Sequence, residues 1–283
     1  MRVATFNLWS GRSLPPRDPA AGLAAPAVDG DRLARSVARL VDLGVDVLAV
    51  QEVDHGQERS GGIDQLAAVA EAFGATHHRF TPTLTGVPGP ASGWQGLERG
   101  HPDAHTTPAG RPAYGIGLVS RLPVLAWRVR ALAGSRAVLP MVLPQVPDDG
   151  SVTKAPRVMF VPDEPRAALA AVVQGPRGPV TVISTHLSFS PLAARRQLRA
   201  VTRWARSLPG PRVLAGDLNL PGPVPGWLTG WTSLARAATY PAPAPRLQLD
   251  HLLTDAATAT AGFTQALSLE VSDHLALLAD VDP

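Results

Sequence analysis

The chain has 283 residues, of which 45% are hydrophobic and 17% are charged, and it contains no cysteine. This composition is typical of a globular protein with a sizeable core. The absence of cysteine excludes a disulfide framework, a thiolate zinc site and a cysteine nucleophile. The formal net charge is +3, and Lys154 is the only lysine, so the small arginine excess permits a phosphate-rich partner without requiring one.

The amino-terminal residues carry no long apolar segment and no signal-type cleavage site. No run of about 20 apolar residues occurs in the sequence, so we expect no transmembrane segment. A cytoplasmic location is the resulting expectation.

Short apolar runs recur along the chain, and three longer segments show helical periodicity. The predicted strands cover 3–8, 45–50, 116–120, 158–161, 168–173, 180–185, 213–215, 247–253 and 275–281. The predicted helices cover 31–43, 64–73 and 191–208. Strands interleaved with few helices favour a mixed α/β fold, in which two packed sheets carry helices on their outer faces. We find no domain linker and expect residues 1–283 to form a single domain.

Two stretches rich in proline interrupt this pattern, at 81–112 and 131–165. Loops of this length inside a compact domain are usually functional or disordered. Both stretches are therefore predicted loop insertions, either on the substrate side or as mobile surface segments.

Polar side chains that suit phosphoester chemistry lie at or near the ends of the apolar runs. They are Asn7, Glu52, His186, Asp217, Asn219, Asp250, Asp273 and His274. Carboxylate and amide oxygens suit Mg²⁺ or Mn²⁺, imidazoles can act on a phosphate, and a carboxylate such as Asp250 can orient an imidazole. Each residue alone would more often be an ordinary turn or surface residue. Together they fit metal-assisted hydrolysis of a phosphoester.

The order of these motifs carries a family resemblance. In chain order they are Asn7 in Ala-Thr-Phe-Asn-Leu, Gln51-Glu52-Val53, Gly117-Leu118-Val119-Ser120-Arg121, Ser184-Thr185-His186-Leu187, Gly216-Asp217-Leu218-Asn219, Leu249-Asp250-His251 and Ser272-Asp273-His274. The series resembles the endonuclease/exonuclease/phosphatase superfamily, the DNase I-like metal-dependent phosphoesterases, from Asn7 to His274. The resemblance implies a four-layered α/β sandwich with its site at the top of two packed sheets.

The resemblance also implies roles for single residues. Glu52 is the expected main ligand of Mg²⁺ or Mn²⁺, with Asn7 and Asp273 near the ion. Asp217 and Asn219 are expected to orient the attacking water and hold the phosphate. His274, paired with Asp250, is expected to act as a base or as a phosphate-stabilising acid, and His186 to contact the scissile phosphate. The resemblance leaves open whether one or two metal ions take part.

Three positions depart from the pattern of many DNA-repair members, namely Trp9, Ile116 and His251. These departures weaken an assignment to the abasic-site endonuclease branch. Some bacterial members, mostly described only as metal-dependent hydrolases, resemble the chain further around Glu52 and from Arg59 to Gln65. Arg59, near Glu52, is therefore a candidate substrate-binding residue, whereas Asp64 is better interpreted as a helix cap. Arg166 directly precedes a predicted strand and is a separate candidate for binding phosphate.

Features predicted to lie on the surface bear on the substrate. The predicted helix 191–208 carries Arg195, Arg196, Arg199, Arg203 and Arg206 opposite its apolar face, which suits either a nucleic-acid backbone or plain solvation. His77, His78, His101 and His105 are a candidate second metal site or unliganded surface histidines. Trp94, Trp227 and Trp231 are candidate contact residues, with core packing as the alternative.

The predicted function is hydrolysis of phosphoester bonds by a Mg²⁺- or Mn²⁺-dependent phosphodiesterase or nuclease, with a phosphoester, possibly nucleic acid, as the partner. One alternative is a lipid or small-molecule phosphoesterase of the sphingomyelinase or inositol-phosphate type. A second is a catalytically silent binding protein, which predicts the loss of at least one of the residues above. None of them is missing.

Overall fold

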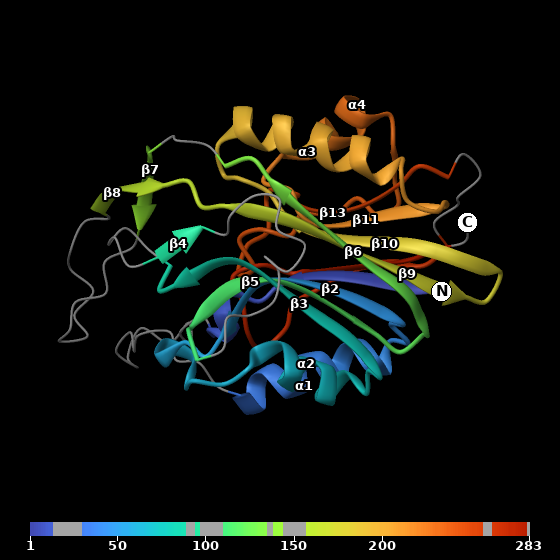
Figure 1. Cartoon of the computed structure of the whole chain (residues 1–283), viewed down its shortest axis with the longest axis horizontal. Helices are drawn as coiled ribbons and strands as arrows, with labels where there is room; N and C mark the ends of the chain where they lie inside the picture. Colours follow the sequence, from blue (N-terminus) through green and yellow to red (C-terminus); the bar gives the residue numbers. More distant parts are fainter. Residues whose placement is uncertain are drawn as a thin grey trace.

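Two mixed β-sheets pack face to face, and helices cover their outer faces (Figure 1). The computed structural model describes residues 1–13, 30–88, 94–96, 110–134, 138–143, 157–256 and 262–281. The four-layered α/β sandwich expected from the sequence is confirmed.

The first sheet has seven strands in the order β14-β15-β1-β2-β5-β3-β4. Their bounds are β1 Arg2–Asn7, β2 Val47–His55, β3 His77–Gly86, β4 Trp94–Gly96, β5 Ala113–Ser120, β14 Thr264–Leu267 and β15 Ala276–Asp280. Only β1 and β2 run parallel, so their carboxyl ends lie at the same edge.

The second sheet has six strands in the order β12-β13-β11-β10-β9-β6. Their bounds are β6 Val124–Leu132, β9 Arg166–Gly175, β10 Gly178–His186, β11 Arg212–Asp217, β12 Thr232–Ser233 and β13 Asp250–Thr254. Here β10 and β11 form the parallel pair. A separate two-stranded sheet pairs β7 Val138–Leu143 with β8 Arg157–Pro162.

Alternation along the strands builds the central core. Side chains such as Val47 and Ala49 from the first sheet meet Val182 and Ala215 from the second. The opposite strand faces pack against helices. Helices α1 Gly30–Asp42 and α2 Gln65–Phe73 cover the first sheet, and α3 Pro191–Ala205 and α4 Val224–Thr229 cover the second. Single-turn 3₁₀ helices lie at η1 Trp9–Gly11 and η2 Glu58–Ser60.

The helices follow from local sequence rules. Asp64 caps α2 by accepting a hydrogen bond from the Ala67 amide, as predicted. Leu198, Val201 and Ala205 are buried on the inner side of α3. Among the described residues, no helix combines the length and apolar character needed to cross a membrane.

Both predicted loop insertions contain strands, of which only the strand at 158–161 was expected. Strand β3 continues to Gly86 and β4 follows it, so 81–112 begins as part of the first sheet. A register shift between Pro82 and Leu84 lets β3 keep a proline inside a paired strand. The stretch 131–165 contains the β7–β8 hairpin. Residues 89–93, 97–109, 135–137 and 144–156, and with them His101 and His105, lie outside the described residues.

The strands β6 and β14 were not predicted, and the strand expected at 247–253 begins only at Asp250. Strand β6 is amphipathic and alternates exposed with half-buried residues, so it lacks the continuous apolar run that marks the central strands.

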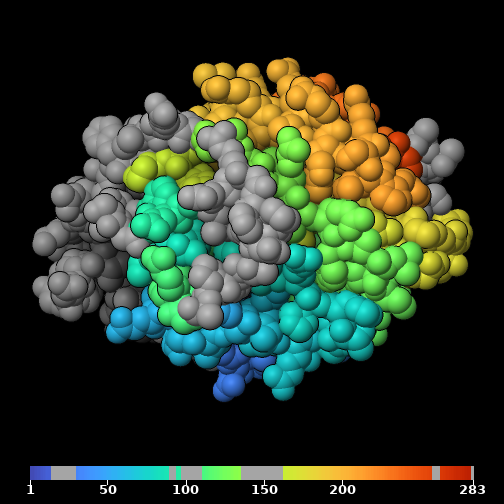
Figure 2. All heavy atoms as spheres, in the orientation of Figure 1, coloured from blue at the N-terminus to red at the C-terminus, as the bar shows by residue number. Residues whose placement is uncertain are grey.

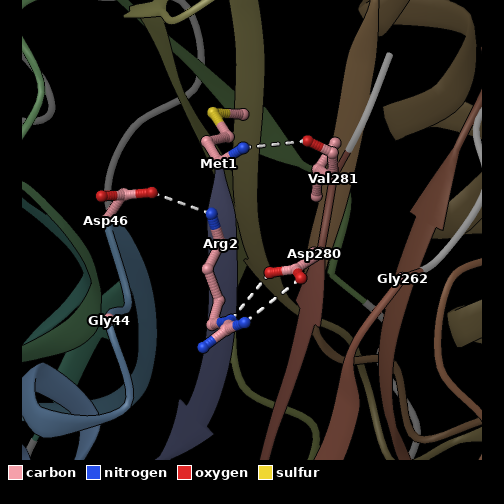
Figure 3. A pocket seen from close by; sticks show the side chains of 7 residues that line it. All are labelled: Met1, Arg2, Gly44, Asp46, Gly262, Asp280 and Val281. Carbon is pink, nitrogen blue, oxygen red and sulfur yellow. Dashed lines mark hydrogen bonds and ion pairs between the residues drawn. The ribbon is translucent and has the colours of Figure 1, made fainter.

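A pocket of about 440 Å³ lies at the amino end of β1, lined by Met1, Arg2, Gly44, Asp46, Gly262, Asp280 and Val281 (Figure 3). Its charged groups are already paired: Arg2 bonds Asp280 at 2.7 Å through Nε, donates to the Leu43 carbonyl and stacks on the Phe263 ring. None of the predicted site residues lines it. Asn7 is at the other end of β1, so this pocket lies far from the predicted site residues. The bonds of Arg2 and Met1 at the pocket join the start of β1 to the end of β15.

Gly216 precedes Asp217 in β11, where it pairs with Thr185 of β10. A Cβ added at Gly216 would come 1.9 Å from the Thr185 carbonyl oxygen. The two parallel strands therefore approach as they do only because this position has no side chain.

We expect Gly216→Ala to lower the free energy of unfolding by about 2 kcal/mol or more, because backbone rather than a flexible side chain would have to move. Urea denaturation of the purified variant measures this change. Gly30→Ala is the matched control, since no atom of the described residues lies within 4 Å of the Cβ that it adds. Equal stability of the Gly216→Ala variant and the wild type would contradict the packing argument.

Candidate active site

The predicted site residues meet at one end of the sandwich because of strand direction. Asn7 ends β1, and the parallel pairing of β1 with β2 sets Asn7 beside Gln51, the residue before Glu52. In the other sheet His186 pairs with Asp217, and Asp217 pairs with Asp250. The carboxyl ends of both parallel pairs thus bring their polar residues to a common edge.

Five non-glycine residues have a left-handed backbone within the described parts of the chain: Trp9, Ser10, Glu52, Asn219 and Ser272. Each one is a predicted site residue or lies within three positions of one. Such conformations cost on the order of 1–3 kcal/mol and persist where the surroundings enforce them. At Glu52 the cause is a bulge in β2 opposite β5, between Val50 and Val53. The strain is therefore concentrated around the site.

Asn7 joins the two sheets. Its buried side-chain amide donates from Nδ2 to Glu52 Oε1 and to Asp217 Oδ2, each at 3.1 Å. Its Oδ1 accepts from the Trp9 amide at 3.0 Å, which fixes the orientation of the amide. One amide group thereby holds two carboxylates that come from opposite sheets.

His274 faces carboxylates on both sides. Its Nδ1 lies 2.8 Å from Asp250 Oδ2, and its Nε2 lies 3.8 Å from Asp217 Oδ2. Burial lowers the pKa of His274, but the charge and hydrogen bond of Asp250, with the charges of Asp217 and Asp273, outweigh it and raise the pKa to about 10. The imidazole is therefore a cation at neutral pH.

His186 has the opposite surroundings. Its Nδ1 lies 3.1 Å from Arg166 Nη1, and its Nε2 lies 3.3 Å from Asn219 Nδ2 and 3.6 Å from Asp217 Oδ2. Burial, the Arg166 charge and the His274 charge hold the pKa of His186 well below its ordinary value. The two histidines of the site therefore carry different charges.

The remaining carboxylates are crowded. Burial raises the pKa of Asp217 to about 7. The positive charge of His274 lowers this pKa, whereas the negative charge of Asp250 raises it further. Burial also raises the pKa of Asp273 to about 6, and Glu52 adds to this rise. Oxygen donors that are buried together and hard to ionise fit a site that a divalent cation would neutralise.

Two places at the site could hold such an ion. Asp217, Asp250 and His274 offer ligand atoms that lie within 4.8 Å of one another. However, His274 and Asp250 already bond to each other, and His274 is cationic, so this trio is better satisfied as a hydrogen-bonded chain. Glu52 and Asp273 offer carboxylate oxygens, and among the described residues neither carboxylate forms a hydrogen bond with an imidazole.

The two predicted arginines lie beside the site in different contacts. Arg59 forms a bidentate pair with buried Asp54 at 2.7 and 2.8 Å and also bonds Ser10. Arg166 contacts His186 and lies 3.8 Å from Glu164. Neither arrangement tests substrate binding, which stays a prediction for both.

Sequence reasoning missed three residues near the site. Burial raises the pKa of Glu164 and Tyr114, and Glu52 raises both further. The Tyr240 ring lies 4.8 Å from the His274 ring. Glu164 could have been expected near the site, since it lies two residues before Arg166 in the sequence. Nothing in the sequence places Tyr114 or Tyr240 there.

The other candidates lie elsewhere in the fold. His77 and His78 are at the start of β3, half-buried and exposed respectively, and Trp94 is half-buried on β4. Trp231 is buried, whereas Trp227 is 78% exposed. His251 is buried, and its Nε2 lies 2.8 Å from the Leu220 carbonyl. Ile116 belongs to the central core.

Comparison with known proteins decides the family. The sequence matches the Endonuclease/Exonuclease/phosphatase family over residues 4–274. The chain belongs to this family. No curated protein matches it at a significant level.

Solved structures of family members and related proteins share the fold. An endonuclease/exonuclease/phosphatase from Beutenbergia cavernae DSM 12333 is similar with a TM-score of 0.62 and 22% identity, covering 99% of this chain and 71% of that one. A mannosyl-6-phosphatase from Bacteroides thetaiotaomicron VPI-5482 has a TM-score of 0.59 and 13% identity, with 100% of both chains covered. A humanized D. rerio TDP2 has a TM-score of 0.53 and 14% identity, covering 100% of this chain and 99% of that one. The family includes nucleases and phosphatases, and these similarities establish the fold.

We expect Asp250→Asn to lower the pKa of His274 from about 10 to its ordinary value or below, because burial remains after the main stabilising charge is lost. An NMR titration of the His274 ring in the metal-free protein measures the shift. Asp255→Asn, which breaks the pair with Arg212, is the matched control. A His274 pKa that stays near 10 in the Asp250→Asn variant would contradict the assigned cause.

Proposed function

We propose that this chain is a Mg²⁺- or Mn²⁺-dependent phosphodiesterase that cleaves nucleic acid or a related diester. One observation carries the proposal: Asp217 lies between the Asn7 amide, which also holds Glu52, and the imidazolium of His274. On one side of the Asp217 carboxylate, Glu52 offers oxygen atoms that can bind a cation. On the other side lies the positively charged imidazole of His274.

Glu52, with Asn7 and Asp273 beside it, is the residue that would hold the ion. A bound divalent cation would supply positive charge that offsets the charge of the phosphate and the leaving oxygen. The pKa of Asp273, raised by burial and by Glu52, supports this placement, since a cation would relieve the repulsion between the two carboxylates.

The chain's own groups account for the rest of the reaction. The Asp217 carboxylate accepts a hydrogen bond from the attacking water and takes its proton as the new P–O bond forms and the bond to the leaving oxygen breaks. Its pKa of about 7 suits a base at neutral pH. His274, held by Asp250, stabilises the negative charge of a phosphate oxygen as a cation. Asn219 and His186 hold the phosphate from the side of the second sheet.

The outer face of α3 favours a polymeric substrate. Arg195, Arg196, Arg199 and Arg203 on α3, and Arg206 at its end, are all exposed, and α3 contains no acidic residue. The orange surface at the top of Figure 2 includes this helix. Helix α3 follows His186 closely in the chain, so its first turn is near the site and its arginines extend away from it. A nucleic-acid backbone fits such a row of positive charges.

Hydrolysis of a small phosphomonoester is the second candidate. Two observations favour it: the structural similarity to a mannosyl-6-phosphatase, and the two arginines beside the site, Arg59 and Arg166. A phosphomonoester dianion would benefit more than a diester from additional positive charge near the phosphate.

The test compares supercoiled plasmid, a bis-aryl phosphodiester and a hexose 6-phosphate as substrates in the presence of Mg²⁺. We expect wild-type protein to nick the plasmid. Glu52→Gln should lower the nicking rate more than about 100-fold, because replacing a residue that only orients a metal ligand already costs about 10–100-fold and Glu52 is the expected ligand itself. Raising the Mg²⁺ concentration should restore part of the rate.

Glu58→Gln is the matched control, since Glu58 is an exposed glutamate on η2 and its loss should leave nicking unchanged. Equal nicking by Glu52→Gln and wild type at the same Mg²⁺ concentration would overturn the role of Glu52. Turnover of the hexose phosphate alone would replace the diesterase proposal with the second candidate.

A further inference from the structure

Arg166 and His186 meet at the edge of the second sheet. Arg166 is the first residue of β9, His186 is the last residue of β10, and these strands pair antiparallel. The Arg166 side chain is 5% exposed, and its Nη1 lies 3.1 Å from His186 Nδ1. A guanidinium offers only N–H donors. This contact is a hydrogen bond only when His186 Nδ1 accepts it and carries no proton.

The other ring nitrogen of His186 has no close acceptor that would stabilise an imidazolium. Its Nε2 lies 3.3 Å from Asn219 Nδ2, and that amide donates to the Leu187 carbonyl at 2.9 Å, which fixes which end is the nitrogen. The nearest carboxylate oxygen, Asp217 Oδ2, lies 3.6 Å away. The Asn219 amide nitrogen is also a donor, so both ring nitrogens face N–H groups, and a neutral ring can accept from only one of them. The Arg166 contact is the shorter of the two and comes from a charged donor, which favours Nδ1 as the acceptor and Nε2 as the nitrogen that carries the proton.

We propose that Arg166 is a positioning residue that holds His186 as the uncharged tautomer with its proton on Nε2. His186 then offers a hydrogen-bond donor, rather than a transferable proton, to a phosphate oxygen at the site. The tautomer rests on the shorter, charged contact from Arg166, whereas the phosphate as acceptor rests on the proposed function. This role reassigns Arg166 from the direct substrate contact expected from the sequence to an indirect one.

The chemistry of the site explains why such a residue is useful. His274 already supplies a cation, and a second imidazolium beside it would be repelled. A neutral donor at His186 binds a phosphate oxygen without a protonation step. The Nε of Arg166 is buried and has no hydrogen-bond partner among the described residues, which costs free energy because the group has lost its contact with water. The contact with His186 is the one short hydrogen bond of this side chain among the described residues.

The direct test is long-range ¹H–¹⁵N NMR of the full chain labelled at histidine, with the His186 signals identified by their loss in His186→Gln. We expect the wild type near neutral pH to show a protonated Nε2 and an unprotonated Nδ1. Arg166→Lys should keep this tautomer, because lysine also has only donors. Arg166→Met should lose it and show a mixture of tautomers or an imidazolium.

Glu164→Gln is the matched control, since it changes the charge that lies 3.8 Å from Arg166 but leaves the guanidinium in place. Its His186 signals should match those of the wild type. A protonated Nδ1 in the wild type, or an unchanged tautomer in folded Arg166→Met, would overturn the proposal. If Arg166→Met does not fold, the wild-type spectrum and Arg166→Lys still decide the outcome.

Kinetics separates this inference from the proposed function. On a substrate that the wild type turns over, Arg166→Met should lower kcat about 10–100-fold with little change in KM, and Arg166→Lys should recover part of the loss. A rise in KM with kcat unchanged would instead assign Arg166 to direct substrate binding. Absence of turnover by the wild type would contradict the proposed function, while the NMR result would still decide the tautomer.

Discussion

The hydrogen bonds of the Asn7 amide are the contact on which the rest of the site depends. One NH₂ group reaches Glu52 in its own sheet and Asp217 in the facing sheet, at equal distances of 3.1 Å. The hydrophobic effect between two packed sheets has no preferred direction, whereas a hydrogen bond requires a defined placement of its donor and acceptor. A buried amide shared by two carboxylates specifies a single alignment, because any slip would leave a buried polar group unpaired. The position of the site is thus coupled to the packing of the whole sandwich.

The same constraint explains the placement of backbone strain and charge. The left-handed residues lie at the bulge inside β2, in the segments that follow β1 and β11, and just before His274, next to the carboxylates and imidazoles of the site. Their environments then separate the two histidines: His274 lies between carboxylates and is charged, whereas His186 faces a guanidinium and an amide and is neutral. A site with one cationic and one neutral imidazole can bind a phosphate by charge and by hydrogen bonding without two imidazolium groups repelling each other.

Much of this arrangement is predictable from the sequence because strand ends are easy to recognise. Polar residues such as Asn7 and Asp217 end buried strands, and parallel pairing brings each of them level with the neighbouring strand's polar residues. The contact between Arg166 and His186 is not predictable in this way, because it depends on antiparallel register and on a side-chain rotamer. Strand β3 was missed because Pro82 reads as a strand breaker, and only a local register shift lets it stay in the sheet. Tyr114 was missed because a buried tyrosine in a central strand has no sequence feature that separates it from core.

Glu52, joined to Asp217 through Asn7, marks the side of the site where we place the cation. Anomalous diffraction from crystals soaked with Mn²⁺ and inorganic phosphate locates the ion. We expect a manganese peak beside the Glu52 carboxylate, with the phosphate between the ion and His274, and no peak within the trio of Asp217, Asp250 and His274. A peak inside that trio, with none beside Glu52, would contradict this placement.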